Sequence, residues 1–154
     1  MAIRFPYEEV NMIYFAEIDE SNWRLGLKVA ENQKHFVADG YRMLARAFAY
    51  RNSRSQAYVI YDEEIPVGMV MYHDCEPLDA YDFSQLFIVE RYQGKGYGKA
   101  ATQKVLEMMK QDGKYKKVVL CYIEGNETAK KLYEGFGFCV IDRDEDEIIM
   151  EMLL

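Results

Sequence analysis

Residues 91–100, RYQGKGYGKA, place three glycines within five positions, between two segments of regular pattern. An apolar run at 85–90 precedes them, and residues 97–110 continue with apolar side chains at helical spacing. Glycine loses more backbone freedom on folding than any other residue, so a cluster of glycines here indicates a need for bare backbone. The segment predicts a strand, a glycine-rich loop and a helix in succession, which is a recurrent binding site for anions.

The residues of this loop distinguish between two familiar kinds of phosphate-binding motif. A dinucleotide loop, G-x-G-x-x-G, would need glycine where Lys99 stands, and a P-loop would need glycine at Gln93 and a hydroxyl group at Ala100. A pyrophosphate remains compatible with the loop, because bare backbone can approach its oxygens while Lys95 and Lys99 supply positive charge. A turn that only packs a strand against a helix remains the alternative.

The rest of the chain alternates strand and helix patterns without linkers or repeats. Expected strands occupy 10–18, two stretches within 56–74, 81–90, 115–123 and a final hairpin in 137–154. Expected helices occupy 21–29, 31–52 with a break near Gly40, the segment from the glycines to Gly113, and 126–136. This order predicts an α/β (α+β) fold with a mixed, mostly antiparallel central sheet flanked by helices.

Composition restricts the class of protein. The chain has 154 residues, enough for one domain with a core, and its formal net charge of −7 disfavours nucleic acid as a partner. It has no apolar run long enough to cross a membrane, and its first residues do not resemble a signal peptide. Cys75, Cys121 and Cys139 are odd in number and widely spaced, which favours reduced thiols in the cytoplasm over disulfides or a metal site.

Two motifs resemble the GNAT superfamily of N-acetyltransferases. Residues 93–98, QGKGYG, match the [QR]-x-x-G-x-[GA] loop, and residues 126–138, NETAKKLYEGFGF, are similar to the signature N-x-x-A-x-x-L-Y-x-x-x-G-F. The two motifs occur in the expected order, and with the strand order the resemblance extends over residues 10–154. It implies a single GNAT-like acetyltransferase domain over residues 1–154, with acetyl-CoA as donor and a primary amine as the usual acceptor.

The same resemblance implies the residues of an acetyl-CoA site. The pyrophosphate would be bound by the loop and the helix start, at Gln93, Gly94, Lys95, Gly96, Tyr97, Gly98 and Lys99. Phe87 and Ile88 would offer backbone groups to the pantetheine arm, with the Ile88 N–H near the thioester carbonyl as an oxyanion-type donor. Asn126 would contact the same arm, although asparagine at this position is also a good helix N-cap.

Tyr133 is the candidate catalytic residue. The resemblance implies that it donates a proton to the departing thiolate, and a tyrosine with its ordinary pKa of about 10 is protonated at neutral pH. Helical spacing also places Tyr133 in an apolar stripe with Leu132 and Phe136, which suits a core residue.

The general base is left open. An ordinary ammonium group costs about 4 kcal/mol to deprotonate at neutral pH. Cys121 stands where some relatives have a glutamate. Glu124 and Gln85 are also near enough in sequence to the expected site to be considered as the base. Deprotonation through water or by an apolar site is preferred over all three.

The acceptor is expected to be a polyamine. Residues 27–38, LKVAENQKHFVA, resemble the corresponding region of bacterial spermine/spermidine acetyltransferases. The distal ammonium groups of a polyamine need carboxylates, for which the candidates are Glu31, Glu76, Asp79 and Asp82. Another small amine, a protein N-terminus and a non-catalytic sensor of acyl-CoA remain alternatives, and the apolar final strands could serve a homodimer.

Overall fold

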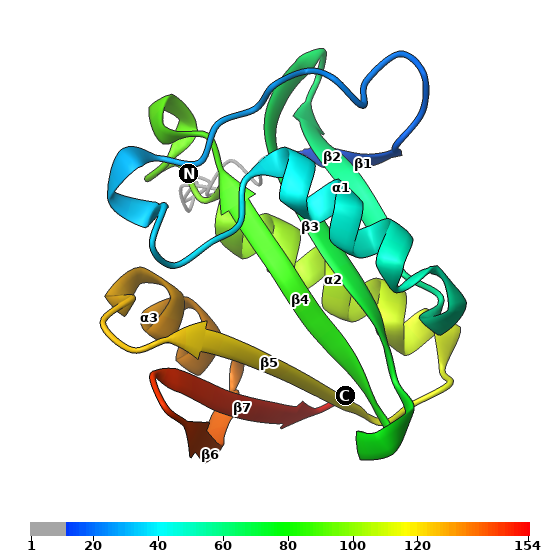
Figure 1. Cartoon of the computed structure of the whole chain (residues 1–154), viewed down its shortest axis with the longest axis vertical. Helices are drawn as coiled ribbons and strands as arrows, with labels where there is room; N and C mark the ends of the chain where they lie inside the picture. The colour runs from blue at the N-terminus through cyan, green and yellow to red at the C-terminus, as the bar shows by residue number, and fades with distance from the viewer. Residues whose placement is uncertain (1–11) are drawn as a thin grey trace, which may run out of the picture.

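The computed structural model describes residues 12–154, which form one seven-stranded sheet with helices on both faces (Figure 1). The strands are β1 (Ile13–Glu17), β2 (Gln56–Asp62), β3 (Ile65–Cys75), β4 (Ala80–Ile88), β5 (Lys117–Ile123), β6 (Cys139–Asp144) and β7 (Glu147–Leu153). The α-helices are α1 (Gly40–Ala49), α2 (Tyr97–Asp112) and α3 (Glu127–Phe136). Short 3₁₀ turns are η1 (Glu31–Gln33), η2 (Arg51–Ser53), η3 (Glu76–Leu78) and η4 (Glu90–Tyr92).

The strands lie in the order β1-β2-β3-β4-β5-β7-β6. Neighbouring strands run antiparallel except β4 and β5, which are parallel and are connected through α2. A parallel pair needs such a crossover, whereas the antiparallel pairs β2–β3 and β6–β7 are joined by tight turns. The prediction of a mixed, mostly antiparallel sheet flanked by helices is therefore confirmed.

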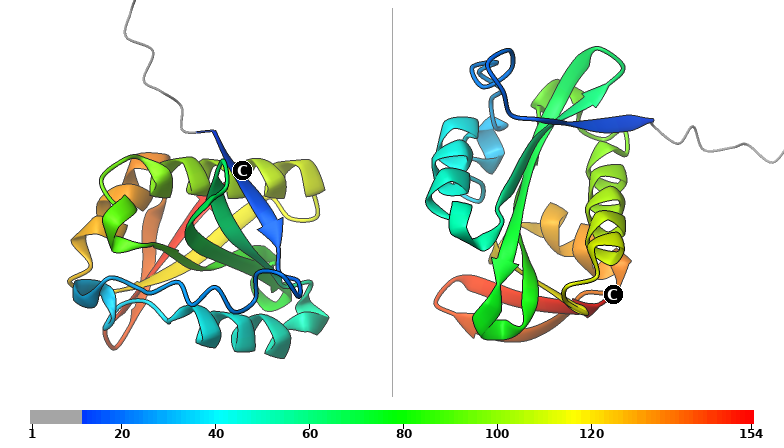
Figure 2. Two further views of the ribbon diagram at one scale, coloured as in Figure 1. Left: turned by 90° about the horizontal axis from the view of Figure 1, so that it is seen from above. Right: turned by 90° about the vertical axis from the view of Figure 1, so that its right-hand side faces the viewer.

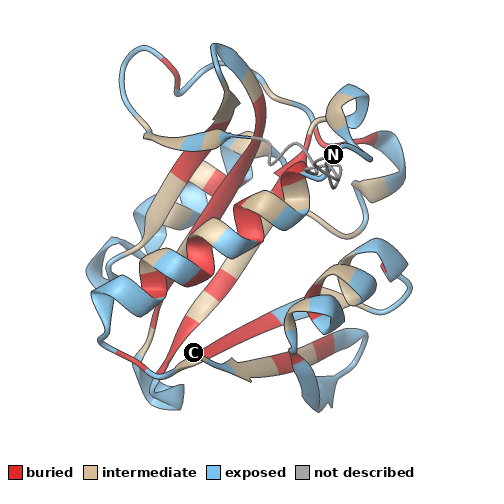
Figure 3. Cartoon of the chain, turned by 180° about the vertical axis from the view of Figure 1, so that it is seen from behind, coloured by how far each residue is buried: buried red, intermediate tan, exposed pale blue. Residues whose placement is uncertain are grey.

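The helices divide the core into two layers. On one face, α1 buries Met43 against Met69 and Met71 of β3 and Phe87 of β4. On the other face, α2 and α3 cover the larger core, and the two views of Figure 2 show α1 and α2 on opposite sides of the sheet. Seen from behind in Figure 3, buried residues recur along α2 with helical spacing: Tyr97, Ala101, Thr102, Val105, Leu106 and Met109. The apolar stripe expected for this helix thus faces the sheet.

The predicted helix at 21–29 is wrong. Residues 20–24 form turns and residues 25–30 are irregular. The reason is local hydrogen bonding, because the Asn22 carboxamide donates to Glu17 O at 2.8 Å and accepts from the Asp19 N–H at 2.9 Å. Gly26 then takes a left-handed φ of 66°, which a continuing helix does not allow. Residues 10 and 11 of the predicted first strand lie outside the described residues.

The predicted helix at 31–52 exists only in its second half. Residues 31–33 form the 3₁₀ turn η1, and α1 starts at Gly40, where the sequence predicted a break. The Asp39 carboxylate caps α1 by accepting a hydrogen bond from the Arg42 N–H at 2.9 Å. The break therefore marks a new helix start, and it places 31–38 as a loop over the sheet.

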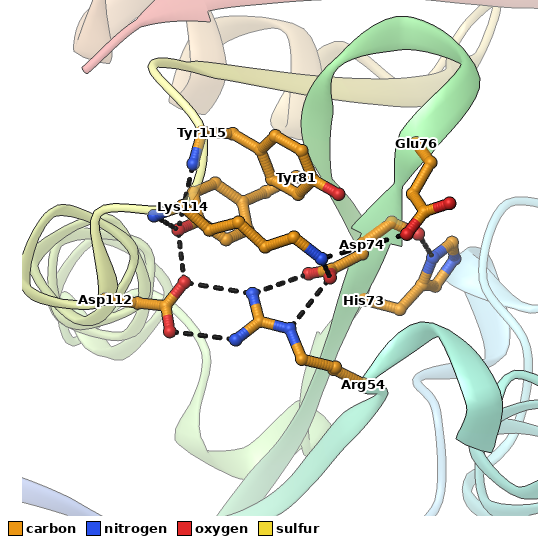
Figure 4. Close-up of polar contacts among 8 residues, drawn as sticks. All are labelled: Arg54, His73, Asp74, Glu76, Tyr81, Asp112, Lys114 and Tyr115. Carbon is orange, nitrogen blue, oxygen red and sulfur yellow. Dashed lines mark hydrogen bonds and ion pairs between the residues drawn. The ribbon is translucent and has the colours of Figure 1, made fainter.

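A polar network closes the sheet at the end of β4 near Ala80 (Figure 4). The Arg54 guanidinium donates to both Asp74 oxygens, at 2.8 and 2.9 Å, and to Asp112 at 2.9 and 3.0 Å. Lys114 Nζ lies 2.6 Å from Asp74, and the Tyr81 hydroxyl donates to Asp112 while it accepts from the Lys114 N–H at 2.9 Å. These contacts tie β3, β4 and the end of α2 together.

Candidate active site

A cavity of about 400 Å³ opens where β4 and β5 diverge. The two strands pair at Tyr81–Val118 and Asp82–Val119, and beyond that register the wedge between them widens toward α3 (Figure 1). The cavity is lined from the η1 region by Val29, Ala30, Gln33, Phe36 and Val37; from β4 by residues 83–88; from the loop and α2 by Tyr92, Gln93, Gly94, Gly96, Tyr97 and Gly98; and from β5 and α3 by Cys121, Tyr122, Asn126, Thr128, Ala129, Leu132 and Tyr133.

The glycine loop turns the chain sharply from β4 into α2. Gly94 and Gly96 have φ of 75° and 88°, a left-handed conformation that glycine adopts without strain. The first helical hydrogen bond runs from the Ala100 N–H to Gly96 O at 3.0 Å, so the N–H groups of residues 97–99 precede it. Gln93 fixes the loop on the strand, because its Nε2 donates to Ile88 O at 3.0 Å. The loop thus presents backbone donors at a helix start beside the cavity.

Most of the residues expected to hold acetyl-CoA line this cavity. Phe87, Ile88, Gln93, Gly94, Gly96, Tyr97, Gly98 and Asn126 do so, whereas the exposed Lys95 and Lys99 do not. The Lys95 Nζ lies 5.9 Å from the centre of the Tyr92 ring. The Tyr97 side chain is buried and its hydroxyl donates to Asp62, a hydrogen bond that raises the pKa of Tyr97 to about 12. Tyr97 therefore offers the cavity its backbone rather than its hydroxyl.

Asn126 caps the start of α3, and Tyr133 lies almost two turns further along the same helix. The Asn126 carboxamide oxygen accepts from the Ala129 N–H at 3.2 Å, so its helix-capping role is confirmed and its NH₂ is the group that can face a ligand. Tyr133 is 8% exposed, and its ring packs edge-on between Phe83 and Phe138 at 5.8 and 5.7 Å. Burial raises the pKa of Tyr133, which keeps the phenol protonated at neutral pH.

The three residues considered as general base differ in their surroundings. Cys121 is an exposed residue that lines the cavity, and the partial desolvation of its thiol there raises its pKa to about 11, so the thiol is protonated at neutral pH. Glu124 is exposed and paired with Arg143. The Gln85 Oε1 accepts from the Ala38 N–H at 3.4 Å and thereby links β4 to the η1 loop. The geometry favours none of the three as a base.

The acidic residues expected to bind a polyamine are scattered. The exposed Glu31 pairs with Lys34 at 2.6 Å, and this hydrogen bond lowers the pKa of its carboxyl. Glu76 lies on η3 at the closed end of the sheet, 3.9 Å from Lys114, and away from the cavity lining (Figure 4). Asp82 lies on β4 with 28% of its side chain exposed, and burial raises the pKa of its carboxyl against the opposing effect of His73 and Arg46.

Several cavity residues escaped the sequence analysis, and Ser84 is the clearest case. The β3–β4 register jumps from Met71–Gln85 to Tyr72–Phe83, so Ser84 is an extra residue in a β-bulge. Its Oγ is buried and has no hydrogen-bond partner among the described residues. Strict alternation along a strand predicts no bulge, and no residue type near Ser84 indicates one.

Neither a metal centre nor a membrane-spanning helix is present within residues 12–154. No three His, Cys, Asp or Glu side chains of this range converge as ligands for a metal ion. None of its helices is both long and apolar enough to span a membrane.

The sequence and the fold each match known proteins. A sequence model of the Acetyltransferase (GNAT) family matches residues 12–138. The spermine/spermidine N(1)-acetyltransferase of Bacillus subtilis (strain 168) is 41% identical over 54 residues, which are 35% of this chain and 36% of that protein. This match thus spans about a third of the relative's length.

Two solved structures share the fold over nearly the whole described chain. An acetyltransferase from Thermus thermophilus superposes with a TM-score of 0.76 at 18% identity, covering 92% of this chain and 97% of that chain. The spermidine N-acetyltransferase from Vibrio cholerae, solved in complex with CoA and spermine, superposes with a TM-score of 0.73 at 17% identity, covering 92% of this chain and 95% of that chain.

Proposed function

Because the chain belongs to the acetyltransferase (GNAT) family, we propose that it transfers an acetyl group from acetyl-CoA to a primary amine, with a polyamine as the preferred acceptor. The observation that carries this proposal is the cavity between β4 and β5, which runs from the glycine loop to Tyr133. We propose further that residues 1–154 act as one domain, since one sheet takes strands from Ile13 to Leu153.

The residues of the cavity fit acetyl-CoA. Gly98 lines the cavity between Leu132 and Ile88, which a Cβ at this position would meet only at ordinary contact distances of 3.9 and 4.0 Å. The N–H groups at the start of α2 suit a pyrophosphate, because the helix dipole favours negative charge there. The apolar walls at Phe87 and Leu132 suit a pantetheine arm.

The open edge of β4 supports a role for the Ile88 N–H. The Val89 N–H bonds to Val67 O at 2.8 Å, on the side of β3. Backbone N–H groups alternate between the two edges of a strand, so the Ile88 N–H points to the opposite edge, toward the cavity. The Ile88 carbonyl is held on that edge by Gln93. We infer that Ile88 N–H stabilises negative charge on a carbonyl oxygen during acyl transfer.

Acetyl-CoA supplies an activated acetyl group on sulfur, and the chain must manage the protons of its transfer to an amine. Tyr133 can donate one to the departing sulfur, because burial keeps its hydroxyl protonated. The proton lost by the amine leaves through water, since the Cys121 thiol does not ionise at neutral pH. The apolar cavity wall near Phe36 disfavours the ammonium form of the acceptor and so assists this loss.

The preference for a polyamine draws on three observations. Two of the three proteins named above, from Bacillus subtilis and Vibrio cholerae, are acetyltransferases of spermine or spermidine by their names. The chain carries a net charge of −7, which attracts cations in general. Asp82 lies on the strand that lines the cavity, three residues before Gln85, or roughly 10 Å along β4. A long amine can therefore reach a carboxylate while its other end lies in the cavity.

The test is the release of CoA thiol from acetyl-CoA with spermine, spermidine, putrescine, lysine, an aminoglycoside and a short peptide. Faster release with spermine and spermidine than with the other amines is the expected result. Release with a different amine keeps the acetyltransferase and removes the polyamine. Tight binding of acetyl-CoA without release by any amine contradicts the catalytic proposal and favours a sensor of acyl-CoA.

A further inference from the structure

His73 is a titratable side chain inside the sheet that the proposed mechanism does not use. It lies on β3 with 3% of its surface exposed, on the same face as Met69 and Met71. Its ring stacks on Tyr50, the C-cap of α1, with centroids 4.4 Å apart and planes 20° apart. A histidine at every-second-residue spacing from two core methionines was a signal in the sequence for a buried titratable group.

The backbone fixes which nitrogen of His73 carries hydrogen. Nδ1 lies 2.8 Å from the carbonyl oxygen of Asp74, as the dashed line in Figure 4 shows. A carbonyl only accepts, so Nδ1 is the donor and carries the proton in every charge state. The side chain of Asp74 is held in turn by Arg54 and Lys114. The tautomer of His73 is therefore set by the rigid, closed end of the sheet.

The second nitrogen faces the carboxylate of Asp82. His73 Nε2 lies 3.7 Å from Asp82 Oδ2 and has no hydrogen-bond partner among the described residues. With the hydrogen on Nδ1, a neutral ring presents a lone pair at Nε2, and an ionised carboxylate presents another. His73 is buried and Asp82 is half-buried, and two acceptors this close in such surroundings repel unless a proton lies between them. The pair is therefore most stable with one proton on either group.

The charges around the pair come from four elements. Arg46 and Tyr50 belong to α1 and its C-cap, and Arg46 opposes the effect of burial on the pKa of Asp82. Cys121 on β5 is a further titratable neighbour, and its pKa responds to Asp82, to Glu147 on β7, to Arg46 and to Cys75 on β3. Arg46 is the positive charge in this set, and its guanidinium lies 5.1 Å from the centre of the Tyr50 ring.

The pair borders the end of the cavity where the acceptor is expected. Asp82 is paired with Val119 on β5, and Cys121 is two residues further along the same face. Cys121 lines the cavity, and the Asp82 charge contributes to its raised pKa after burial itself. Asp82 thus stands just beyond the cavity wall, with its partner His73 behind it, away from solvent.

We propose that a distal ammonium group of the acceptor binds the Asp82 carboxylate and expels to solvent the proton that His73 and Asp82 share. This rests on the proposed function for the identity of the acceptor. Before binding, the pair holds one proton and is neutral overall. After binding, Asp82 is ionised and paired with the ammonium, His73 is neutral, and one proton has left. Binding of a polyamine is therefore coupled to proton release and strengthens as pH rises, until the pair is deprotonated without ligand.

The experiment is isothermal titration of spermidine into the full chain saturated with CoA, which allows no turnover. Titrations at pH about 7 in phosphate and in Tris, whose ionisation enthalpies differ, give the number of protons released. Butylamine has one amine and no distal charge, so we expect it to release about one proton fewer than spermidine in the wild-type chain. Equal counts for the two amines overturn the proposal, and this comparison needs no variant.

Two variants separate the two members of the pair. His73→Asn keeps a donor to the Asp74 carbonyl and removes Nε2, and we expect about one proton less at an undiminished spermidine affinity. Asp82→Asn should lose the same proton and also about tenfold in spermidine affinity. Glu134→Gln, at an exposed acid of α3 that lies outside the cavity lining, should change neither quantity. Equal losses of affinity in His73→Asn and Asp82→Asn would indicate disturbed packing and contradict the proposal.

The proton count and the release of CoA thiol distinguish a failure of this inference from a failure of the proposed function. If amines release CoA thiol from acetyl-CoA but spermidine and butylamine release equal numbers of protons, only the proton coupling is wrong. If spermidine binds with the expected proton release but no amine is acetylated, the coupling stands and the catalytic proposal fails.

Discussion

The two ends of the β4–β5 pair differ in how their polar groups are satisfied. At the closed end, Tyr81 and Asp82 pair with β5, and the Tyr81 hydroxyl is bonded to Asp112 and to the Lys114 N–H. At the open end, β4 from residue 83 onward has no β5 partner, and its free edge lines the cavity. The difference indicates that the paired end holds the two strands together, while the unpaired backbone groups at the other end remain available to a ligand.

The largest expected effect concerns the open end. Tyr133→Phe removes the hydroxyl and keeps the ring contacts with Phe83 and Phe138. We expect kcat to fall about 100-fold, the usual loss when a general acid is removed, with unchanged acetyl-CoA affinity. Thiol-release kinetics and a binding titration measure the two quantities. Tyr115→Phe is the control, because the Tyr115 hydroxyl is buried without a partner among the described residues and lies outside the cavity lining. Equal kcat in both variants would remove Tyr133 from proton transfer.

The next prediction tests whether β3 holds the open edge in place. A Cβ on Gly68 would lie 2.2 Å from the Phe87 carbonyl oxygen, a backbone atom that cannot move aside alone. Gly68→Ala should therefore cost about 3 kcal/mol of unfolding free energy in urea and weaken acetyl-CoA binding by displacing Phe87 and Ile88. Gly135→Ala on α3 meets nothing within 4 Å and should stabilise the helix slightly. A stable Gly68→Ala variant with normal acetyl-CoA affinity contradicts the close approach.

The closed end is tested by Arg54→Met. Asp74 is buried, and this burial is more than offset by hydrogen bonds from Arg54 and Lys114, so its pKa is lowered. The hydrogen bond from Arg54 also holds the pKa of Asp112 below its ordinary value. We expect a loss of about 2 kcal/mol at neutral pH, less than for a fully buried pair, because the Arg54 side chain is 45% exposed.

The loss of unfolding free energy in Arg54→Met should depend on pH, in a direction set by the lowered pKa values of Asp74 and Asp112. A carboxyl with a lowered pKa contributes stability above its ordinary pKa near 4, and this contribution is lost as pH falls through the lowered folded value. The difference between the wild-type chain and Arg54→Met should therefore shrink below pH about 4 in urea titrations. A difference that stays constant with pH would mean that Arg54 acts through packing of its alkyl stem.

The sequence predicted the open end better than the closed end. The loop at Gly94 and Gly96 is a local feature, since the conformations that need glycine are set within a few residues. The Arg54 network joins residues 20 and 58 positions apart, and no local pattern relates them. The Ser84 bulge and the turn at Asn22 were missed for another reason, because single side-chain and register effects there override strand alternation and helical spacing.

The smallest expected effect is at Cys121, which lies on β5 two residues beyond Val119, the last residue paired with β4. Its thiol lines the cavity and occupies the strand position at which a base was considered. Because partial desolvation raises the pKa of the exposed Cys121 to about 11, the thiol stays protonated between pH 6 and pH 9 and accepts no proton there. Cys121→Ala should therefore change kcat by no more than about twofold and leave the shape of its pH profile unaltered across that range. The contrary result would be an increase of kcat with pH that is lost in Cys121→Ala but kept in the control variant Cys139→Ala. That result would make Cys121 the base and require an ionised thiol in the presence of substrate.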